Sequence, residues 1–176
     1  FLENVDFEKY ADFVIDYPIL FIKSGDKYLS GKNYKFSDYM NGNIQEINKS
    51  LPSIDDLGLH LSTIFTENRL KQYIELRSMD TCGWNCICAG PAFFTGLLYG
   101  NLDEALEFIS KWEKKDLLNA YKDAPMKGLD TNLMGIDMIY WISNLLKIAE
   151  KGLEKRDFIG KSGTNETKYL EHLNKI

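Results

Sequence analysis

The first part of the chain combines one helical period with short apolar runs. Apolar side chains recur every three to four residues over 6–15, which predicts a helix that ends before Pro18. Two apolar runs, 19–23 and 27–29, then flank a turn that contains Gly25. This order predicts a β-hairpin, because glycine accepts the positive φ that a tight turn requires.

A period of two follows farther along the chain. Ser53 precedes two acidic residues and is typical of the N-cap of a short helix that leads toward Leu61. Polar and apolar side chains then alternate over 69–77, which predicts one β-strand. One face carries Leu70, Gln72, Ile74 and Leu76, and the other carries Arg69, Lys71, Tyr73, Glu75 and Arg77. The predicted strand is therefore apolar on one face and charged on the other.

The second half of the chain has mainly helical patterns. Expected helices cover 91–100, 101–112, 116–121, a long segment that opens at Thr131 or Asn132, and 164–176. Pro125 is expected to stop the third of them, because proline lacks the N–H that a helix interior uses. A few strands followed by helices, without an internal repeat, indicate the α+β class.

Length and the chain ends shape the expected domain organisation. A chain of 176 residues is long enough to bury a core as one domain. We expect one partial domain over 1–176, with a strand-containing part at 1–81 and a helical part at 82–176. The chain begins with Phe1 and shows no signal or transit pattern, so we expect a piece of a longer protein.

Charge and cysteine content indicate which classes of partner and which cellular compartment to expect. Lys and Arg number 21 against 26 Asp and Glu, and no basic stripe is present, so no nucleic-acid partner is expected. No apolar run has the length of a membrane span, so no membrane partner is expected either. The three cysteines lie within 82–88, unlike a secreted disulfide scaffold, and we therefore expect a cytoplasmic protein.

The same cysteines allow two interpretations. Cys82, Cys86 and Cys88 are close enough for three thiolates to converge on one metal ion or to form a redox cluster. Their spacing matches no common zinc or iron–sulfur pattern, and free cysteine often behaves as a small buried hydrophobe. The second interpretation is favoured.

The charged face of the predicted strand is the clearest candidate for chemistry. Glu75 and Arg77 are two residues apart, so both side chains leave the same face. A carboxylate can hold Mg²⁺, and a guanidinium can bind phosphate oxygens with two parallel hydrogen bonds. An antiparallel sheet can also keep one charged face in water, and the isolated pattern favours that interpretation. For Arg69 and Lys71, a surface position and a place in the site are equally compatible with the pattern.

A longer string of residues resembles a known family. It runs from His60-Leu61-Ser62-Thr63-Ile64-Phe65 through Arg69-Leu70-Lys71 and Tyr73-Ile74-Glu75-Leu76-Arg77 to Gly96-Leu97-Leu98-Tyr99. In order and spacing it is similar to the glutamate-cysteine ligases of plants and many proteobacteria. The resemblance covers nearly the whole chain, with the closest match over 60–112, and identifies the chain as the C-terminal part of such a ligase.

The resemblance implies a fold and a set of site residues. The fold is an antiparallel sheet of the glutamine synthetase-like carboxylate-amine ligase type, partly present here and followed by a helical C-terminal region. Glu75 is implied as a ligand of Mg²⁺, and Arg77 as the catalytic residue that contacts the phosphates of ATP or the acyl phosphate. Tyr73 shares their face and is expected to line the substrate and nucleotide pocket.

The implied reaction is the first step of glutathione biosynthesis. ATP-dependent ligation joins the γ-carboxylate of L-glutamate to the amine of L-cysteine through γ-glutamyl phosphate. Glutamate, cysteine, ATP and the missing N-terminal half are the implied partners, Mg²⁺ is the implied cofactor, and the fragment alone is expected to be inactive. The alternatives are a non-catalytic fragment or interaction module of the same fold, or a ligase with a different amine acceptor.

Two positions, Cys88 and Asp130, bear on properties known from that family. Cys88 matches a position that joins a regulatory disulfide in plant members, but its partner lies upstream of this chain. Asp130 stands where the family commonly has a lysine. We therefore expect no intact plant-type redox switch, and the loop around Asp130 lacks the lysine that would support an anion contact there.

Overall fold

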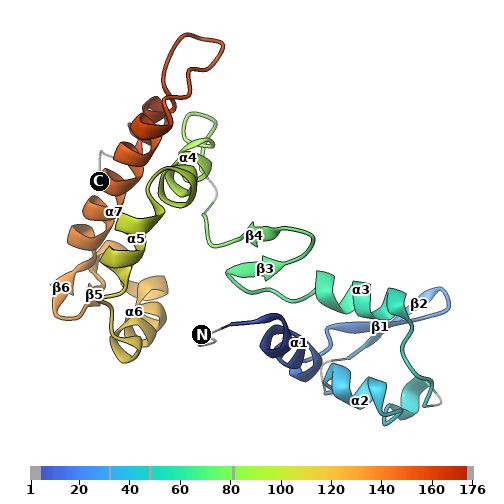
Figure 1. Cartoon of the computed structure of the whole chain (residues 1–176). Helices are drawn as coiled ribbons and strands as arrows, with labels where there is room; N and C mark the ends of the chain where they lie inside the picture. The colour runs from blue at the N-terminus through green and yellow to red at the C-terminus, as the bar shows by residue number, and fades with distance from the viewer. Residues whose placement is uncertain (1–4, 32, 48, 81, 174–176) are drawn as a thin grey trace. The chain divides into compact units, whose positions relative to one another are not determined.

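The structure is a computed structural model that describes residues 5–31, 33–47, 49–80 and 82–173. It consists of two compact units, unit 1 at Phe1–Met79 and unit 2 at Asp80–Ile176 (Figure 1). Within the described ranges, no helix is both long enough and apolar enough to span a membrane. The expected single partial domain with parts at 1–81 and 82–176 stays a prediction.

Unit 1 contains short helices and two hairpins. Its elements are α1 (Phe7–Asp16), β1 (Phe21–Ser24), β2 (Lys27–Ser30), α2 (Phe36–Met40), a 3-10 helix (Gln45–Ile47), α3 (Ile54–Ser62), β3 (Asn68–Leu70) and β4 (Ile74–Leu76). The predicted first helix and hairpin are confirmed, and Gly25 has a φ of +59° in the turn. Ser53 caps α3 as predicted: its Oγ accepts from the Asp56 N–H, and the Asp56 carboxylate accepts from the Ser53 N–H.

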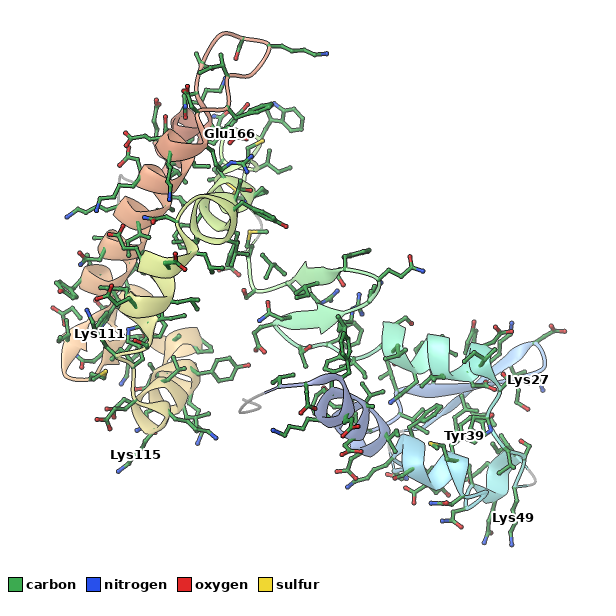
Figure 2. The ribbon with its side chains drawn as sticks, viewed as in Figure 1. Lys27, Tyr39, Lys49, Lys111, Lys115 and Glu166 are labelled. Carbon is green, nitrogen blue, oxygen red and sulfur yellow. A yellow bond between two sulfur atoms is a disulfide. The ribbon has the colours of Figure 1, made fainter. Side chains whose placement is uncertain are left out.

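The core of unit 1 lies between the first hairpin, α2 and the short 3-10 helix. It is built from Ile19, Ile22, Phe36, Tyr39, Ile44 and Ile47, each at most 8% exposed. Figure 2 labels Tyr39, which with Phe36 is one of two aromatic residues of α2 in this core. His60 of α3 stacks on Phe36, with ring centroids 4.6 Å apart, and its Nε2 lies 2.8 Å from the Val14 carbonyl oxygen. His60 therefore connects α3 with α1 and α2.

The single strand predicted over 69–77 is wrong. The chain forms β3 and β4 as an antiparallel hairpin, and the turn at 71–73 is closed by a hydrogen bond from the Lys71 N–H to the Tyr73 carbonyl, 2.8 Å. The register pairs Arg69 with Glu75, so the two stay on one face, as they would in a straight strand. The alternation of polar and apolar residues over 69–77 therefore cannot distinguish a single strand from a hairpin. The predicted apolar face is also incorrect at Ile74, which is 69% exposed.

Unit 2 is mainly helical. It contains α4 (Ala89–Thr95), a π-helical continuation (Gly96–Gly100), α5 (Leu102–Ile109), α6 (Lys114–Lys127), a 3-10 helix (Gly128–Asp130), β5 (Asn132–Leu133), β6 (Ile136–Asp137), α7 (Met138–Arg156) and a 3-10 helix (Glu166–Leu170). Figure 1 shows the long helix α7 running alongside α4 and α5. The π-helical segment meets α7 backbone to backbone: a Cβ on Gly96 would lie 2.2 Å from the Ala149 carbonyl oxygen. This close approach requires glycine.

Three helix boundaries in unit 2 differ from the prediction. Pro125 does not stop the third helix, because it lies in the last turn of α6 and removes only one hydrogen bond there. The long helix begins at Met138 rather than near 131, because β5 and β6 first form a hairpin around Met134 and Gly135, both with positive φ. The predicted helix over 164–176 is a 3-10 helix at Glu166–Leu170, and 174–176 lie outside the described residues.

The α+β class is confirmed. In the described residues the strands pair as three separate two-stranded antiparallel sheets, β1 with β2, β3 with β4, and β5 with β6. The glutamine synthetase-like sheet implied by the family resemblance stays a prediction.

Candidate functional site

Three charged side chains gather on the β3–β4 hairpin of unit 1. Arg69 lies on β3 directly opposite Glu75 on β4, and Arg77 follows β4 on the same side as Glu75. We name these residues the Arg-Glu-Arg cluster. The structure thus brings Glu75 and Arg77 together, as the sequence predicted, and adds Arg69 as a third member.

Arg69 is the buried member of the cluster, with 5% of its surface exposed. Its Nε and Nη2 donate to Glu75 Oε2 at 2.9 and 2.8 Å. Its Nη1 donates to the carbonyl oxygen of Ser62, the last residue of α3. The question left open for Arg69 is answered: it is not a surface side chain. No residue pattern predicts this burial directly, because the cross-strand pairing depends on the turn at 71–73.

Arg77 is the accessible guanidinium of the cluster, with 29% of its side chain exposed. Its Nη1 lies 3.3 Å from Glu75 Oε1, and its Cζ lies 5.4 Å from the centroid of the Phe65 ring. Its backbone N–H donates to the Glu67 carbonyl at 2.7 Å, which extends the hairpin pairing by one residue. The side chain is therefore restrained by Glu75 and Phe65 and is partly exposed to solvent.

The electrostatics of the cluster favour an anionic ligand. Hydrogen bonds from Arg69 are the main cause that lowers the pKa of Glu75, and the charges of Arg69, Arg77 and Lys71 lower it further against the opposing effect of burial. Glu75 is thus ionised at neutral pH. Two guanidinium groups against one carboxylate leave a net positive charge, and phosphate or carboxylate groups are natural ligands for such a surface.

Tyr73 lies at the turn of the hairpin and is 61% exposed. Its carbonyl closes the turn, so Tyr73 lies between β3 and β4 and not in either strand. Lys71, on the other side of the turn, is also exposed. The role predicted for Tyr73 in lining the pocket stays a prediction.

The fit of the hairpin to Mg²⁺ can be judged from its donor atoms. A carboxylate oxygen is the hard ligand that Mg²⁺ prefers, and among the described residues Glu75 Oε1 has the long 3.3 Å contact with Arg77 as its one hydrogen bond. Within the described parts of the chain, no group of three or more His, Cys, Asp or Glu side chains is placed to hold a metal ion. Glu75 therefore suits Mg²⁺ as a single ligand, and a complete site needs ligands from elsewhere.

The three cysteines do not converge on a metal position. Cys82 and Cys86 form a disulfide, while Cys88, at the N-cap of α4, is a free and exposed thiol. Neither earlier interpretation describes this arrangement. A pair of bonded sulfurs has no thiolate to offer a metal ion.

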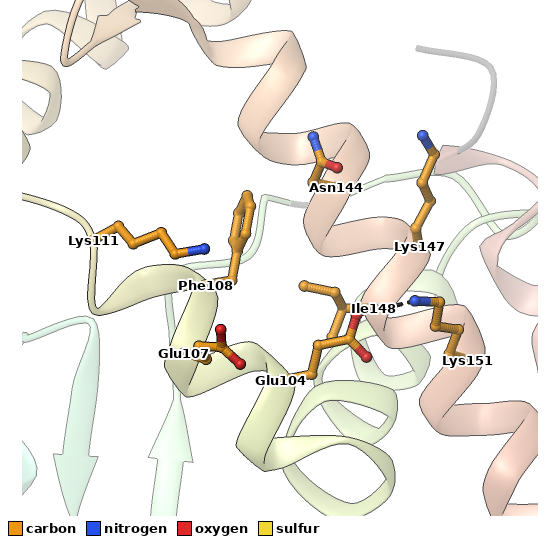
Figure 3. Close-up of a pocket in the computed structure, with 8 residues that line it drawn as sticks. All are labelled: Glu104, Glu107, Phe108, Lys111, Asn144, Lys147, Ile148 and Lys151. Carbon is orange, nitrogen blue, oxygen red and sulfur yellow. Dashed lines mark hydrogen bonds and ion pairs between the residues drawn. The ribbon is translucent and has the colours of Figure 1, made fainter.

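A second feature is a cavity of about 320 Å³ between α5 and α7 in unit 2 (Figure 3). Lys151 Nζ pairs with Glu104 Oε1 at 3.0 Å across it, and hydrogen bonds from Asn101 and Lys151 lower the pKa of Glu104. Its charged side chains are of mixed sign and exposed to solvent. Because it contains none of the predicted site residues, the hairpin of unit 1 is the better candidate site.

Comparison with known proteins gives consistent matches. The family model described as glutamate-cysteine ligase family 2 (GCS2) matches residues 1–176. The chain is 36% identical over 162 residues to a chloroplastic glutamate-cysteine ligase of Solanum lycopersicum, covering 90% of this chain and 31% of the relative. It is 33% identical over 178 residues to the Nicotiana tabacum enzyme, covering 100% and 33%. An Arabidopsis thaliana relative is 33% identical over 160 residues, covering 90% and 31%.

These matches indicate how much of the relatives' length the chain covers and in which compartment the relatives are found. The chain spans about one third of the length of the curated relatives that it matches. The cytoplasmic location expected from the cysteine content is wrong, because these relatives are named as chloroplastic. Cysteine count and spacing carry no compartment address, and the Cys82–Cys86 disulfide does not support the reducing surroundings on which that expectation rested.

Proposed function

Because the chain belongs to glutamate-cysteine ligase family 2, we propose that it is part of an ATP-dependent enzyme that joins L-glutamate to L-cysteine. The reaction ligates the γ-carboxylate of glutamate to the amine of cysteine through γ-glutamyl phosphate, as the first step of glutathione biosynthesis. The arrangement of Arg77 supports the proposed ligase reaction most directly. Its guanidinium is restrained by Glu75 and Phe65, partly exposed, and set in a cluster of net positive charge.

In this proposal the task of Arg77 is charge neutralisation. The glutamate carboxylate and the γ-phosphoryl group of ATP are both anionic, so their approach is opposed by repulsion. Arg77 binds phosphoryl oxygens through paired hydrogen bonds and reduces that repulsion as charge develops. Tyr73, at the exposed turn, contributes to the pocket for substrate or nucleotide.

Bound Mg²⁺ supplies further neutralisation of the phosphate oxygens in this proposal. Glu75 offers one carboxylate oxygen, Oε1, while Arg69 keeps Oε2 engaged. The remaining ligands and much of the substrate pocket come from the rest of the longer ligase. The fold proposed for the complete enzyme is the antiparallel sheet of the glutamine synthetase-like ligases, and the location proposed is the plastid.

Phosphate release by the full-length protein tests the proposal. With glutamate, cysteine and ATP, we expect cysteine-dependent release, and the 176-residue chain alone should release none. Arg77→Lys should lower kcat/KM about 100-fold, as loss of one preorganised donor to a developing anion typically does. The matched control is Arg156→Lys, which alters a pair with Glu166 in unit 2 and should leave kcat/KM unchanged.

Two other results would change the conclusion. If the full-length protein releases no phosphate in response to cysteine or to any other amino acid, the chain is part of a non-catalytic module. If another amino acid supports faster release than cysteine, the ligase chemistry stands and the amine acceptor is different.

A further inference from the structure

Arg69 and Arg77 contact the same carboxylate in different ways. The side chain of Arg69 is 7% exposed, and that of Arg77 is 29% exposed. Arg69 makes two short contacts with Glu75 Oε2 and a third with the Ser62 carbonyl at the end of α3, whereas Arg77 makes one contact of 3.3 Å with Oε1. The Arg69 guanidinium is thus fixed and enclosed, whereas that of Arg77 is held by fewer contacts and is partly exposed.

The fixed guanidinium determines where the carboxylate lies. Each of the three described contacts of Arg69 uses a different nitrogen, and together they leave the group no freedom to turn toward a ligand. Glu75 is held at Oε2, so its Oε1 has a defined position. That oxygen, with the Phe65 ring, in turn restrains Arg77. The end of α3 therefore holds Arg69, Arg69 holds Glu75, and Glu75 restrains Arg77.

We propose that Arg69 is a positioning residue that acts through Glu75 to aim Arg77 at a phosphate group of the ligand. That the ligand carries a phosphate rests on the proposed function, whereas the contacts that link Arg69, Glu75 and Arg77 do not depend on it. Lysine cannot replace Arg69, because one ammonium nitrogen cannot reach both Glu75 and the Ser62 carbonyl in the same geometry. A charge-conserving substitution thus removes the positioning and keeps the charge.

Binding of inorganic pyrophosphate to the full-length protein, measured by calorimetry in the presence of EDTA, tests the inference without turnover and without metal. Arg69→Lys should weaken pyrophosphate binding about tenfold, comparable to the loss of one good interaction. Arg156→Lys, which alters a similar arginine–carboxylate pair in unit 2, should change it less than about twofold. Thermal unfolding of each variant checks that the fold is retained.

A double-mutant cycle separates positioning from a general structural role. In a Glu75→Gln background, Arg69→Lys should have almost no further effect on pyrophosphate binding, because the connection to Arg77 is already broken. An equal effect in both backgrounds overturns the inference. If Arg69→Lys does not fold, Glu75→Asp replaces it: the shorter side chain breaks the same connection, and unchanged pyrophosphate binding overturns the inference.

Failure of this inference is distinguishable from failure of the proposed function. If wild type binds pyrophosphate in an Arg69-dependent way but shows no cysteine-dependent phosphate release, the positioning role stands and the ligase function fails. If wild type is an active ligase and Arg69→Lys behaves like Arg156→Lys, the positioning role fails alone. If wild type neither binds pyrophosphate nor releases phosphate, both fail.

Discussion

We expect wild type to lose stability in mild acid because of His60, and the His60→Gln variant to lose less. His60 is 2% exposed, and its Nε2 lies 2.8 Å from the Val14 carbonyl oxygen, so Nε2 carries the proton and donates it. Its Nδ1 is buried and has no hydrogen-bond partner among the described residues. Protonation would place a charged N–H there without an acceptor. Burial therefore lowers the pKa of His60, although its hydrogen bond to Val14 acts in the opposite direction.

The sign of the pH effect follows from this lowered pKa. In the unfolded chain histidine binds a proton below about pH 6.5, whereas folded His60 stays neutral to a lower pH. The unfolded state binds more protons in that window, so the free energy of unfolding falls as pH falls. The loss is about 1.4 kcal/mol per pH unit below 6.5, until the folded-state pKa is reached.

Hydrogen exchange of the α3 amides, measured against urea at pH 7.5 and 5.5, reports the stability of unit 1. Wild type should lose more stability than His60→Gln between these values, by at most about 1.4 kcal/mol. Glutamine is the matched replacement, because its side-chain amide can still donate to Val14 but does not titrate. The other histidine, His172, is exposed and present in both proteins. Equal losses in the two proteins would refute the reasoning.

Three further predictions concern stability, each measured by urea unfolding. Ser53→Ala should destabilise unit 1 by about 1 kcal/mol, because it removes the N-cap of α3. Gly152→Ala should destabilise unit 2 by about 1–3 kcal/mol, because its Cβ would lie within 2.0 Å of the Gly96 carbonyl oxygen. Gly58→Ala in α3 is its control and should stabilise by about 0.5–1 kcal/mol, since no atom lies within 4 Å of the added Cβ. Lys151→Gln should change stability by less than about 1 kcal/mol, because its pair with Glu104 is exposed to solvent.

The amino-acid sequence by itself determined the features that depend on neighbouring residues. Ser53 with the acids after it predicts an N-cap, and Gly25 between two apolar runs predicts a tight turn; both are confirmed. Such features form because a local side chain or a permissive φ satisfies the backbone within a few residues. The order of residues from His60 to Tyr99 likewise predicted the family, which the family model confirms over 1–176.

Only the tertiary structure decided how those local pieces meet. The charged period over 69–77 fits a strand and a hairpin equally, because Arg69 and Glu75 share a face in either case. The turn at 71–73 contains no glycine, proline or asparagine that would have predicted it. Contacts from residues outside the hairpin stabilise it: the Tyr10 hydroxyl accepts from the Leu70 N–H at 3.1 Å, and the Ser62 carbonyl accepts from Arg69. The burial of Arg69, and with it the arrangement of the candidate site, follows from those contacts and not from the pattern of the strand.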